Sequence, residues 1–287
     1  MNYTSIEYQV DNGILTLLLS RPEAMNAFTM DMCNELEHAF MRASDDDHVR
    51  VIVVTGSGKA FCAGMDLSSE GNVFGLDNVK QPTLAEMQEP EKMDGVRDSA
   101  GRVTLAIYDC KKPVIAAING AAVGVGATMV CAMDIRLASE KARIGFVFGK
   151  IGIAPEGCST WFLPRIVGLQ QSLKWMLSAE IFDAAEAKSG GLVLEVCAPD
   201  NLLPRAYEMA RQMADNTAAI SCALTRQMLY RNSAAAHPIE AHRVESLAVF
   251  YTSQVDGQEG VAAFLDKRKA NFTSVPSTDM PSFYPWW

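Results

Sequence analysis

The sequence is short of basic residues and of histidine. Its 287 residues contain 25 Lys and Arg against 34 Asp and Glu, a formal net charge of -9. A chain this acidic lacks the clustered positive charge that non-specific binding to nucleic acid requires, so we expect no nucleic-acid partner. The four histidines are scattered and show no spacing typical of a metal site or a Ser-His triad. We therefore expect no metal.

Long apolar runs and paired cysteine motifs are also absent. No run approaches the roughly 20 apolar residues that span a membrane, and the first ten residues do not follow the signal-peptide pattern. The seven cysteines are widely spaced and form no Cys-x-x-Cys motif. We interpret them as reduced thiols rather than as disulfides or zinc ligands. These absences predict a cytoplasmic protein with no membrane association.

Two glycine-rich stretches match nucleotide-binding motifs only in part. Residues 55–59 are followed by Ala60, where a P-loop needs Ser or Thr, and Val53 occupies the position of its first Gly. Gly124 and Gly126 lack the third Gly of a dinucleotide fingerprint. Neither stretch predicts a bound nucleotide cofactor.

Apolar periodicity predicts an α/β region followed by a helical region. Strands are expected at 6–10, 14–20, 49–55, 113–118, 135–138 and 192–196. Helices are expected at 29–43, capped by Thr29, at 96–109, and after a turn at 120–126 as far as about 133. Further helices are expected at 202–214, 218–232, 239–253 and 258–269, and a long surface loop at 70–94. The predicted division is an α/β core at 1–198 and a helical region at 199–287.

Three stretches carry residues that point to chemistry: 60–67 (AFCAGMDL), 112–126 (KPVIAAINGAAVGVG) and 149–159 (GKIGIAPEGCS). Together with 20–27, 163–168 and 264–268, in this order, they resemble the crotonase (enoyl-CoA hydratase/isomerase) superfamily over about residues 5–272. The resemblance implies a ClpP-like spiral of repeated ββα units. It also implies that C-terminal helices join subunits into a homotrimer or a dimer of trimers. The implied substrate is an acyl-CoA thioester, with coenzyme A as part of the substrate and no separate cofactor.

The resemblance further implies an oxyanion hole made of backbone N–H groups. By motif position these belong to Met65, after a glycine, and Val125, inside a Gly-Val-Gly turn. They would hold the thioester oxygen while an enolate forms. Small residues suit this role because the backbone must touch the ligand, and a helix N-terminus favours developing negative charge. The alternative is that Gly124 and Gly126 only permit a tight turn.

The acid–base groups differ from those of the family's hydratases. Where those enzymes carry two glutamates, this chain has Thr128 and Phe148, and neither can activate water at neutral pH. Glu156, in a Pro-Glu-Gly turn, is instead similar to the single catalytic base of peroxisomal-type Δ3,Δ2-enoyl-CoA isomerases. In an apolar pocket its pKa should be raised. Alternatively, Glu156 caps a helix beginning near Ser159 or is a solvated turn residue.

Further residues are expected to contact the substrate. Asp66 and Leu67 resemble family positions near the CoA adenine, and Lys267 resembles a residue that C-terminal helices supply, often to another subunit. The full predicted substrate-binding set is Ala63, Asp66, Leu67, Phe148, Trp161 and Lys267. Core packing, or a solvated face for Lys267, are the alternatives.

Three functional hypotheses follow from the sequence. The preferred one is an enoyl-CoA isomerase that shifts a double bond from C3 to C2, with Glu156 as base. The second is a hydratase that uses a different carboxylate arrangement. The third is an acyl-CoA-binding protein with little catalysis, because the fold tolerates the loss of catalytic residues.

Overall fold

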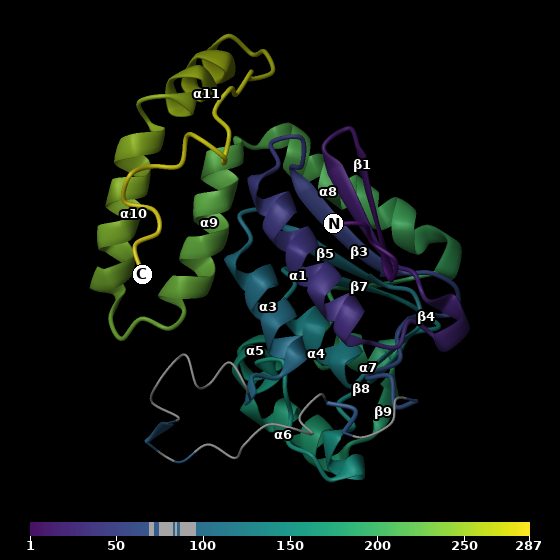
Figure 1. Cartoon of the computed structure of the whole chain (residues 1–287). Coiled ribbons are helices and arrows are strands. Elements are labelled where there is room, and N and C mark those ends of the chain that lie inside the picture. Colours follow the sequence, from purple (N-terminus) through teal and green to yellow (C-terminus); the bar gives the residue numbers. More distant parts are fainter. Residues whose placement is uncertain (69–71, 75–82, 84, 87–95) are drawn as a thin grey trace.

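Two β-sheets form the centre of the molecule (Figure 1). The computed structural model describes residues 1–68, 72–74, 83, 85–86 and 96–287. In order across the larger sheet, the strands are β1 (Ile6–Asp11), β2 (Ile14–Leu19), β3 (Val51–Gly56), β5 (Val114–Ile118), β7 (Ile135–Ser139) and β10 (Glu195–Cys197). In the smaller sheet they are β4 (Ala60–Cys62), β6 (Ala121–Val123), β8 (Arg143–Gly145) and β9 (Ile181–Asp183).

A repeated ββα unit generates both sheets. Strands β3 and β4 precede α3 (Ser99–Asp109), β5 and β6 precede α4 (Val125–Cys131), and β7 and β8 precede α5 (Ser159–Val167). The first strand of each unit joins the larger sheet and the second joins the smaller one. Because β4, β6 and β8 pair in parallel, their carboxyl ends lie along one edge. This repeat confirms the ββα plan expected from the sequence.

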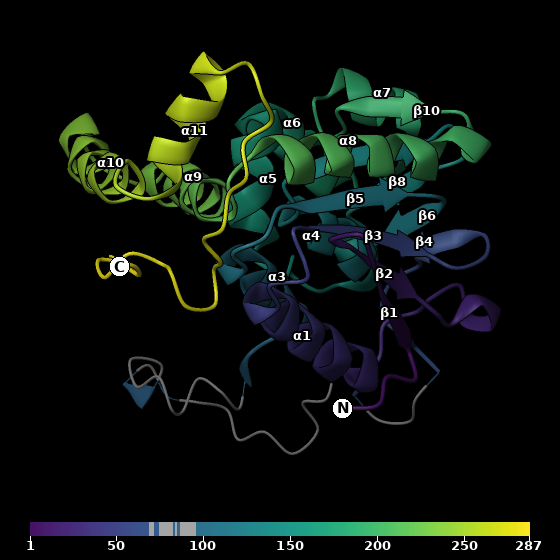
Figure 2. The same cartoon turned by 90° about the horizontal axis from the view of Figure 1, so that it is seen from above.

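Helices cover both faces of the larger sheet. Along β3, Val51 and Val53 share a core cluster with α8 (Leu202–Asn216), whereas Ile52 and Val54 belong to the cluster that contains α1 (Met30–Asp45). Figure 2 shows α8 on one side of the sheet and α1 on the other. A strand buried on both faces needs apolar residues at every position. This need explains why the strand reads as an unbroken apolar run.

Most predicted elements are confirmed within a few residues. The N-terminal strands pair antiparallel, and the Thr29 side chain caps α1 by accepting a hydrogen bond from the Met32 N–H. The prediction of a turn at 120–126 was incomplete, because the short strand β6 lies within this segment. Strands β4, β8 and β9 escaped prediction because each has only three residues, too few for a periodic pattern. The helices α6 (Leu169–Ser178) and α7 (Ala184–Ser189) were also not predicted.

The C-terminal helices extend away from the sheets. Figure 1 shows α9 (Ala219–Asn232), α10 (Pro238–Thr252) and α11 (Asp256–Leu265) to one side of the core. Helix α8, by contrast, packs on the larger sheet. The division at residue 198 stays a prediction, and the loop expected at 70–94 falls almost wholly outside the described residues. Among those residues, no helix combines the length and hydropathy needed to cross a membrane.

Arg226 on α9 holds the C-terminal end of α3. Its guanidinium donates hydrogen bonds to the carbonyls of Ile107 (2.8 Å) and Cys110 (2.6 Å) and to the Asp134 carboxylate (2.8 Å). The Arg226 side chain is only 5% exposed. Carbonyls at a helix C-terminus carry partial negative charge, so a buried cation there is stabilising. This anchor fixes α3, whose other end reaches the site described below.

We predict that Arg226→Met lowers the free energy of unfolding by about 3 kcal/mol, because the mostly buried Asp134 carboxylate loses its ion-pair partner. Chemical denaturation measures this change. The control is Arg243→Ala, because the Arg243 side chain is 68% exposed. This substitution should change the free energy of unfolding by less than about 0.5 kcal/mol. Equal stability of the two variants would contradict the anchoring role of Arg226.

Candidate active site

A cavity of about 320 Å³ opens where the parallel strands of the smaller sheet end. Its walls come from the segments that follow β4, β6 and β8, at 63–67, 123–125 and 147–156. Ligand sites in parallel sheets commonly lie at this edge. The lining residues are Ala63, Gly64, Met65, Leu67, Phe74, Val96, Asp98, Ser99, Val123, Gly124, Val125, Val147, Phe148, Ile151, Ile153, Ala154 and Glu156. The lining is mostly apolar, and Asp98 and Glu156 are its only carboxyl groups among the described residues.

Two glycines with positive φ angles lie at or next to the cavity. Gly124 has a φ of 54° and directly precedes α4; a side chain there would be strained. A Cβ on Gly157 would lie 2.8 Å from the Thr128 hydroxyl oxygen. Gly157 therefore lets the turn that carries Glu156 approach α4 closely.

The two predicted oxyanion-hole residues face the same cavity. Phe28 donates to the Gly64 carbonyl and accepts from the Asp66 N–H, which leaves the intervening Met65 N–H outside this pairing. Val125 is the first residue of α4, where a backbone N–H has no partner within its own helix. In the described part of the chain, neither N–H donates a hydrogen bond. Both could bind an anionic oxygen, although that role stays a prediction.

The Glu156 side chain turns toward α4. Its Oε1 accepts a hydrogen bond of 2.9 Å from the Thr128 hydroxyl. Its main-chain carbonyl accepts the Ser159 N–H (3.1 Å), so the backbone of Glu156, not its carboxyl, meets the start of α5. The carboxyl is thus neither a helix cap nor a freely solvated turn group. It borders the apolar cavity, as the preferred interpretation of the sequence requires.

Burial gives this carboxyl an unusual affinity for protons. Removal from water raises the pKa of Glu156 from its ordinary value of 4.5 to about 8. The hydrogen bond from the Thr128 hydroxyl opposes this shift, while the negative charge of Asp98 raises the pKa of Glu156 further. A carboxyl that exchanges protons near neutral pH suits general acid–base chemistry.

Asp98 is a site residue that the sequence did not reveal. It caps α3 by accepting the Gly101 N–H, and its Oδ1 also accepts the Gly157 N–H at 3.0 Å. The second bond ties α3 to the residue next to Glu156. Aspartate is a preferred residue at helix N-termini. That preference is the one signal in the sequence that could have singled out Asp98. Its position beside a turn 58 residues later depends on tertiary packing.

The structure brings together part of the predicted set. Ala63, Met65, Leu67, Val125, Phe148 and Glu156 all line the cavity. Asp66 lies outside the lining, where it pairs with Arg21 at 2.9 Å. Hydrogen bonds from Ser68, then the Arg21 interaction, lower the pKa of Asp66 to about 2. A structural ion pair therefore accounts for Asp66 without a ligand.

The last two predicted residues also lie outside the cavity of the single chain. Trp161 packs edge-on against Tyr108 and Phe162, as the core-packing alternative predicts. Lys267 is exposed just beyond α11. Contacts of Asp66, Trp161 and Lys267 with coenzyme A stay predictions.

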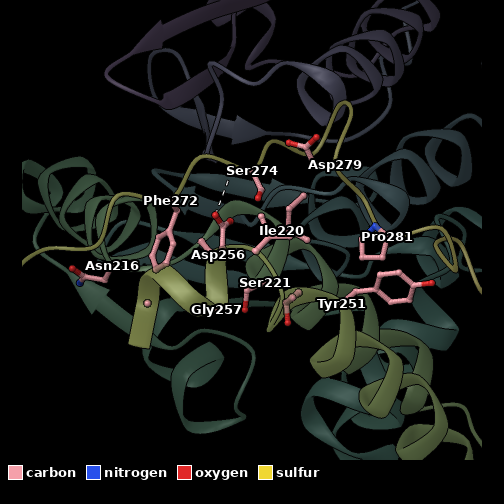
Figure 3. A pocket seen from close by; sticks show the side chains of 14 residues that line it. Asn216, Ile220, Ser221, Tyr251, Asp256, Gly257, Phe272, Ser274, Asp279 and Pro281 are labelled. Carbon is pink, nitrogen blue, oxygen red and sulfur yellow. Dashed lines mark hydrogen bonds between the residues drawn. The ribbon is translucent and has the colours of Figure 1, made fainter. Parts of the chain in front are cut away.

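A second cavity, of about 380 Å³, lies among the C-terminal helices (Figure 3). Asp256, Ile220 and Phe272 surround it, and the Asp256 carboxylate accepts a 3.5 Å hydrogen bond from the Ser274 N–H. The other Asp256 oxygen, Oδ2, is buried and has no partner in the described part of the chain. The second carboxyl of this cavity, Asp279, accepts the Val275 N–H.

Within the described residues, no group of three or more His, Cys, Asp or Glu side chains comes together in a cluster that could hold a metal ion. The expectation that no metal is used stays a prediction. The polar groups that the described residues place around the Glu156 cavity include two carboxyl groups and the backbone N–H groups of Met65 and Val125.

Residues 9–275 match the sequence profile described as enoyl-CoA hydratase/isomerase. The chain belongs to the enoyl-CoA hydratase/isomerase family. Its α/β fold is that of the crotonases, as the motifs indicated. A solved structure, the probable enoyl-CoA hydratase/isomerase of Mycobacterium abscessus, superimposes with a TM-score of 0.81 at 31% identity. That alignment covers 94% of this chain and 98% of the other.

Similar family members carry different activities in their names. Enoyl-CoA hydratase ACTT3 of Alternaria alternata is 37% identical over 264 residues, which cover 91% of this chain and 83% of that protein. The 1,2-epoxyphenylacetyl-CoA isomerase of Escherichia coli is 31% identical and covers 92% of this chain and 96% of its own length. Family membership therefore leaves the choice between hydratase and isomerase to the site.

The raised pKa of Glu156 makes stability depend on pH. Below about pH 4.5 the carboxyl is protonated in both folded and unfolded chains; between about 4.5 and 8 only the folded chain keeps the proton. A raised folded-state pKa means that stability is lost as pH rises through this range. We predict that Glu156→Gln, which cannot ionise, melts at a higher temperature than the parent chain at pH 9. At pH 4.5 the two should melt within about 2 °C of each other.

The control for this experiment is Glu180→Gln, at an exposed position. It should leave the melting temperature unchanged at both pH values. A Glu156→Gln variant that melts at or below the parent temperature at pH 9 would show that the Glu156 carboxyl is not held in a poorly hydrated position.

Proposed function

We propose that this protein is an enoyl-CoA isomerase that moves a double bond from C3 to C2 of an acyl-CoA thioester. The observation that carries the proposal is the Glu156 carboxyl, which borders an apolar cavity that the Met65 and Val125 backbone also lines. Its pKa of about 8 suits a group that takes up a proton and gives it back. Coenzyme A would belong to the substrate, with no additional cofactor.

The proposed reaction needs one carboxyl group. The Glu156 carboxylate takes a proton from C2, so the C2–H bond breaks and its electrons form an enolate. The Met65 and Val125 N–H groups stabilise the negative thioester oxygen, and one such donor is worth about 3–4 kcal/mol in other enzymes. Glu156 then returns the proton to C4, and the double bond comes to lie between C2 and C3. Atoms and charge balance without water.

The surroundings of Glu156 support proton transfer rather than water addition. Phe148 and Ile153 contribute apolar surface to the cavity, which disfavours bound water. Thr128 occupies a position where the family's hydratases carry a glutamate, and here its hydroxyl donates to Glu156. A threonine hydroxyl fixes the base in place but cannot act as a second base at neutral pH.

A hydratase is the second candidate, because one observation favours it. Asp98 lines the same cavity as Glu156, and two carboxyl groups could in principle activate water and deliver a proton. The names of similar proteins such as ACTT3 also include hydratases. A binding protein with little catalysis is the third candidate, and the perturbed Glu156 carboxyl argues against it.

Association into a homotrimer or a dimer of trimers belongs to the same proposal. Large apolar side chains are exposed on the C-terminal helices, including Leu229 (71%), Val249 (66%) and Phe264 (83%). Apolar surface of this kind is typical of contacts with another subunit. Such packing would also give Lys267 an opportunity to reach a neighbour's substrate.

We predict that Glu156→Gln reduces 3-enoyl-CoA to 2-enoyl-CoA conversion by about 10²–10⁴-fold, because the amide cannot accept the C2 proton. Binding of a saturated acyl-CoA, measured by calorimetry, should persist. In the parent chain kcat/KM should rise with pH through about 8, as Glu156 loses its proton. Near-parental turnover of Glu156→Gln would remove this residue from the mechanism.

We also predict little hydration of crotonyl-CoA by the parent chain, at least about 10²-fold below its isomerase activity. The loss of absorbance of the conjugated thioester measures hydration, and 3-enoyl-CoA isomerisation in the same preparation is the control. Hydration as fast as isomerisation would favour the hydratase. Tight binding without turnover of either substrate would favour the binding protein.

A further inference from the structure

The C-terminal segment 276–287 returns from α11 to two other helices. Figure 1 shows it in yellow beside α9 and α10. The family profile matches residues 9–275, so the segment lies beyond it. We propose that residues 276–287 form an intrachain clasp, which holds α9 and α10 against the α/β core and shields an apolar face of these helices from other chains. This proposal goes beyond the reaction at Glu156 and does not depend on it.

The clasp completes a small apolar core between α9 and α10. The buried members of this core are Ile220 and Leu224 of α9 and Ala248 of α10. Within α10, which the structure describes throughout, only Ala248 is buried. The partly buried side chains packed against these residues are Met228, Met280, Phe283, Tyr284 and Trp286, and all but the first belong to the clasp. Most of the apolar surface that covers α10 in this core therefore comes from the clasp.

Hydrogen bonds hold the first residues of the clasp against the core. The Pro276 carbonyl accepts a hydrogen bond of 3.0 Å from Lys111 Nζ. Ser277 donates its N–H to the Asp47 carboxylate at 3.2 Å, and its hydroxyl donates to the same carboxylate. Lys111 directly follows the end of α3, and Asp47 lies between α1 and β3. A segment near a chain terminus is ordered mainly where contacts of this kind tie it down.

An arginine on α9 contacts the far end of the clasp. The Arg231 guanidinium lies 3.6 Å from the ring centre of Trp287 and 4.3 Å from the ring centre of Tyr108 on α3. It also donates a hydrogen bond of 2.6 Å to the Asp109 carboxylate. A guanidinium group stacks favourably on aromatic rings. Arg231 therefore joins the clasp, α9 and the C-terminal end of α3.

The middle of the clasp contacts α10 directly. The hydroxyl oxygens of Tyr251 and Ser282 lie 3.1 Å apart and share a hydrogen bond. The rings of Tyr251 and Phe283 lie 5.7 Å apart, centre to centre. The clasp thus contacts the core, α9 and α10 along one short segment. Its release should loosen α10 first, because α10 has the least buried surface of its own.

Release of the clasp would also uncover an apolar face. Ile220 and Ala248 are each only 5% exposed while the clasp is in place. Leu229 and Val249, on the same two helices, are 71% and 66% exposed even with the clasp present. The clasp therefore leaves one apolar surface open to a neighbouring subunit and covers another. An uncovered second surface would favour association with further chains.

The test is the double substitution Phe283→Ser/Trp286→Ser in the full chain. We expect amide hydrogen exchange in α10 to accelerate by at least about 10-fold, because two aromatic side chains leave the cluster that holds this helix. Exchange in β3 and β5, at the centre of the larger sheet, should not change. Mass spectrometry of peptic fragments measures both. The variant should also bind more anilinonaphthalenesulfonate, a dye for exposed apolar surface.

Two single variants make the result specific. Thr278→Ala is the matched control, because Thr278 is exposed, belongs to the same segment and donates its hydroxyl only to the adjacent Asp279 among the described residues. It should leave exchange in α10 unchanged. Trp287→Leu removes the ring that Arg231 contacts, and the Trp287 side chain is 51% exposed. It should accelerate exchange in α10 by a smaller factor, which covers the case in which the double variant does not fold.

A disulfide test decides which chain supplies the clasp. The variant Asp47→Cys/Ser277→Cys places two thiols where side chains now form a hydrogen bond. Mild oxidation should join them within one chain, so a nonreducing gel should show a monomer, and Asp47→Cys alone is the control. A disulfide-linked dimer would mean that a second copy supplies the segment, and absence of the disulfide would mean that the segment lies elsewhere. Either result would overturn the intrachain clasp.

The exchange measurement is equally decisive. Unchanged exchange in α10 of a folded Phe283→Ser/Trp286→Ser variant would show that the clasp does not hold this helix. Unchanged dye binding by the same variant would contradict the shielding of the apolar face.

Discussion

The site depends on one unfavourable feature, a carboxyl group held against an apolar cavity. Glu156 could avoid this environment by turning to solvent, but the hydrogen bond from the Thr128 hydroxyl holds its side chain toward α4. Partial burial raises the pKa of Glu156 to about 8. The folded chain thus loses stability as the pH rises from about 4.5 to about 8, and it gains a group able to exchange protons near neutrality.

The ββα repeat is what makes this arrangement possible. Because β4, β6 and β8 run in parallel, the segments after them meet at one edge of the smaller sheet and bring Met65, Val125 and Glu156 to one cavity. Helix α3 adds Asp98 from its N-terminus, while Arg226 anchors the opposite end. The distant helix α9 therefore contributes to the position of Asp98, which lines the same cavity as Glu156.

Sequence patterns predicted the fold well, for identifiable physical reasons, whereas the roles of the proposed site residues stay predictions. Strands such as β3 are covered on both faces, so they read as unbroken apolar runs, and the Pro-Glu-Gly turn directed attention to Glu156. Three-residue strands left no periodic pattern. Asp98 was missed because its capping role is local, whereas its contact with the Glu156 turn arises from packing between distant segments. Asp66 is the opposite case. Its position in the family motif suggested a contact with coenzyme A, whereas the structure shows an ion pair with Arg21.

The most direct test of the central claim is a crystal structure of Glu156→Gln with a 3-enoyl-CoA bound. We predict that the substituted side chain at position 156 lies within roughly 3–3.5 Å of C2 and close to C4. The thioester oxygen should lie about 2.7–3.1 Å from the Met65 and Val125 nitrogens. An acyl chain that bypasses position 156, with Asp98 or another ionisable group over C2, would contradict the assignment of Glu156 as the proton carrier.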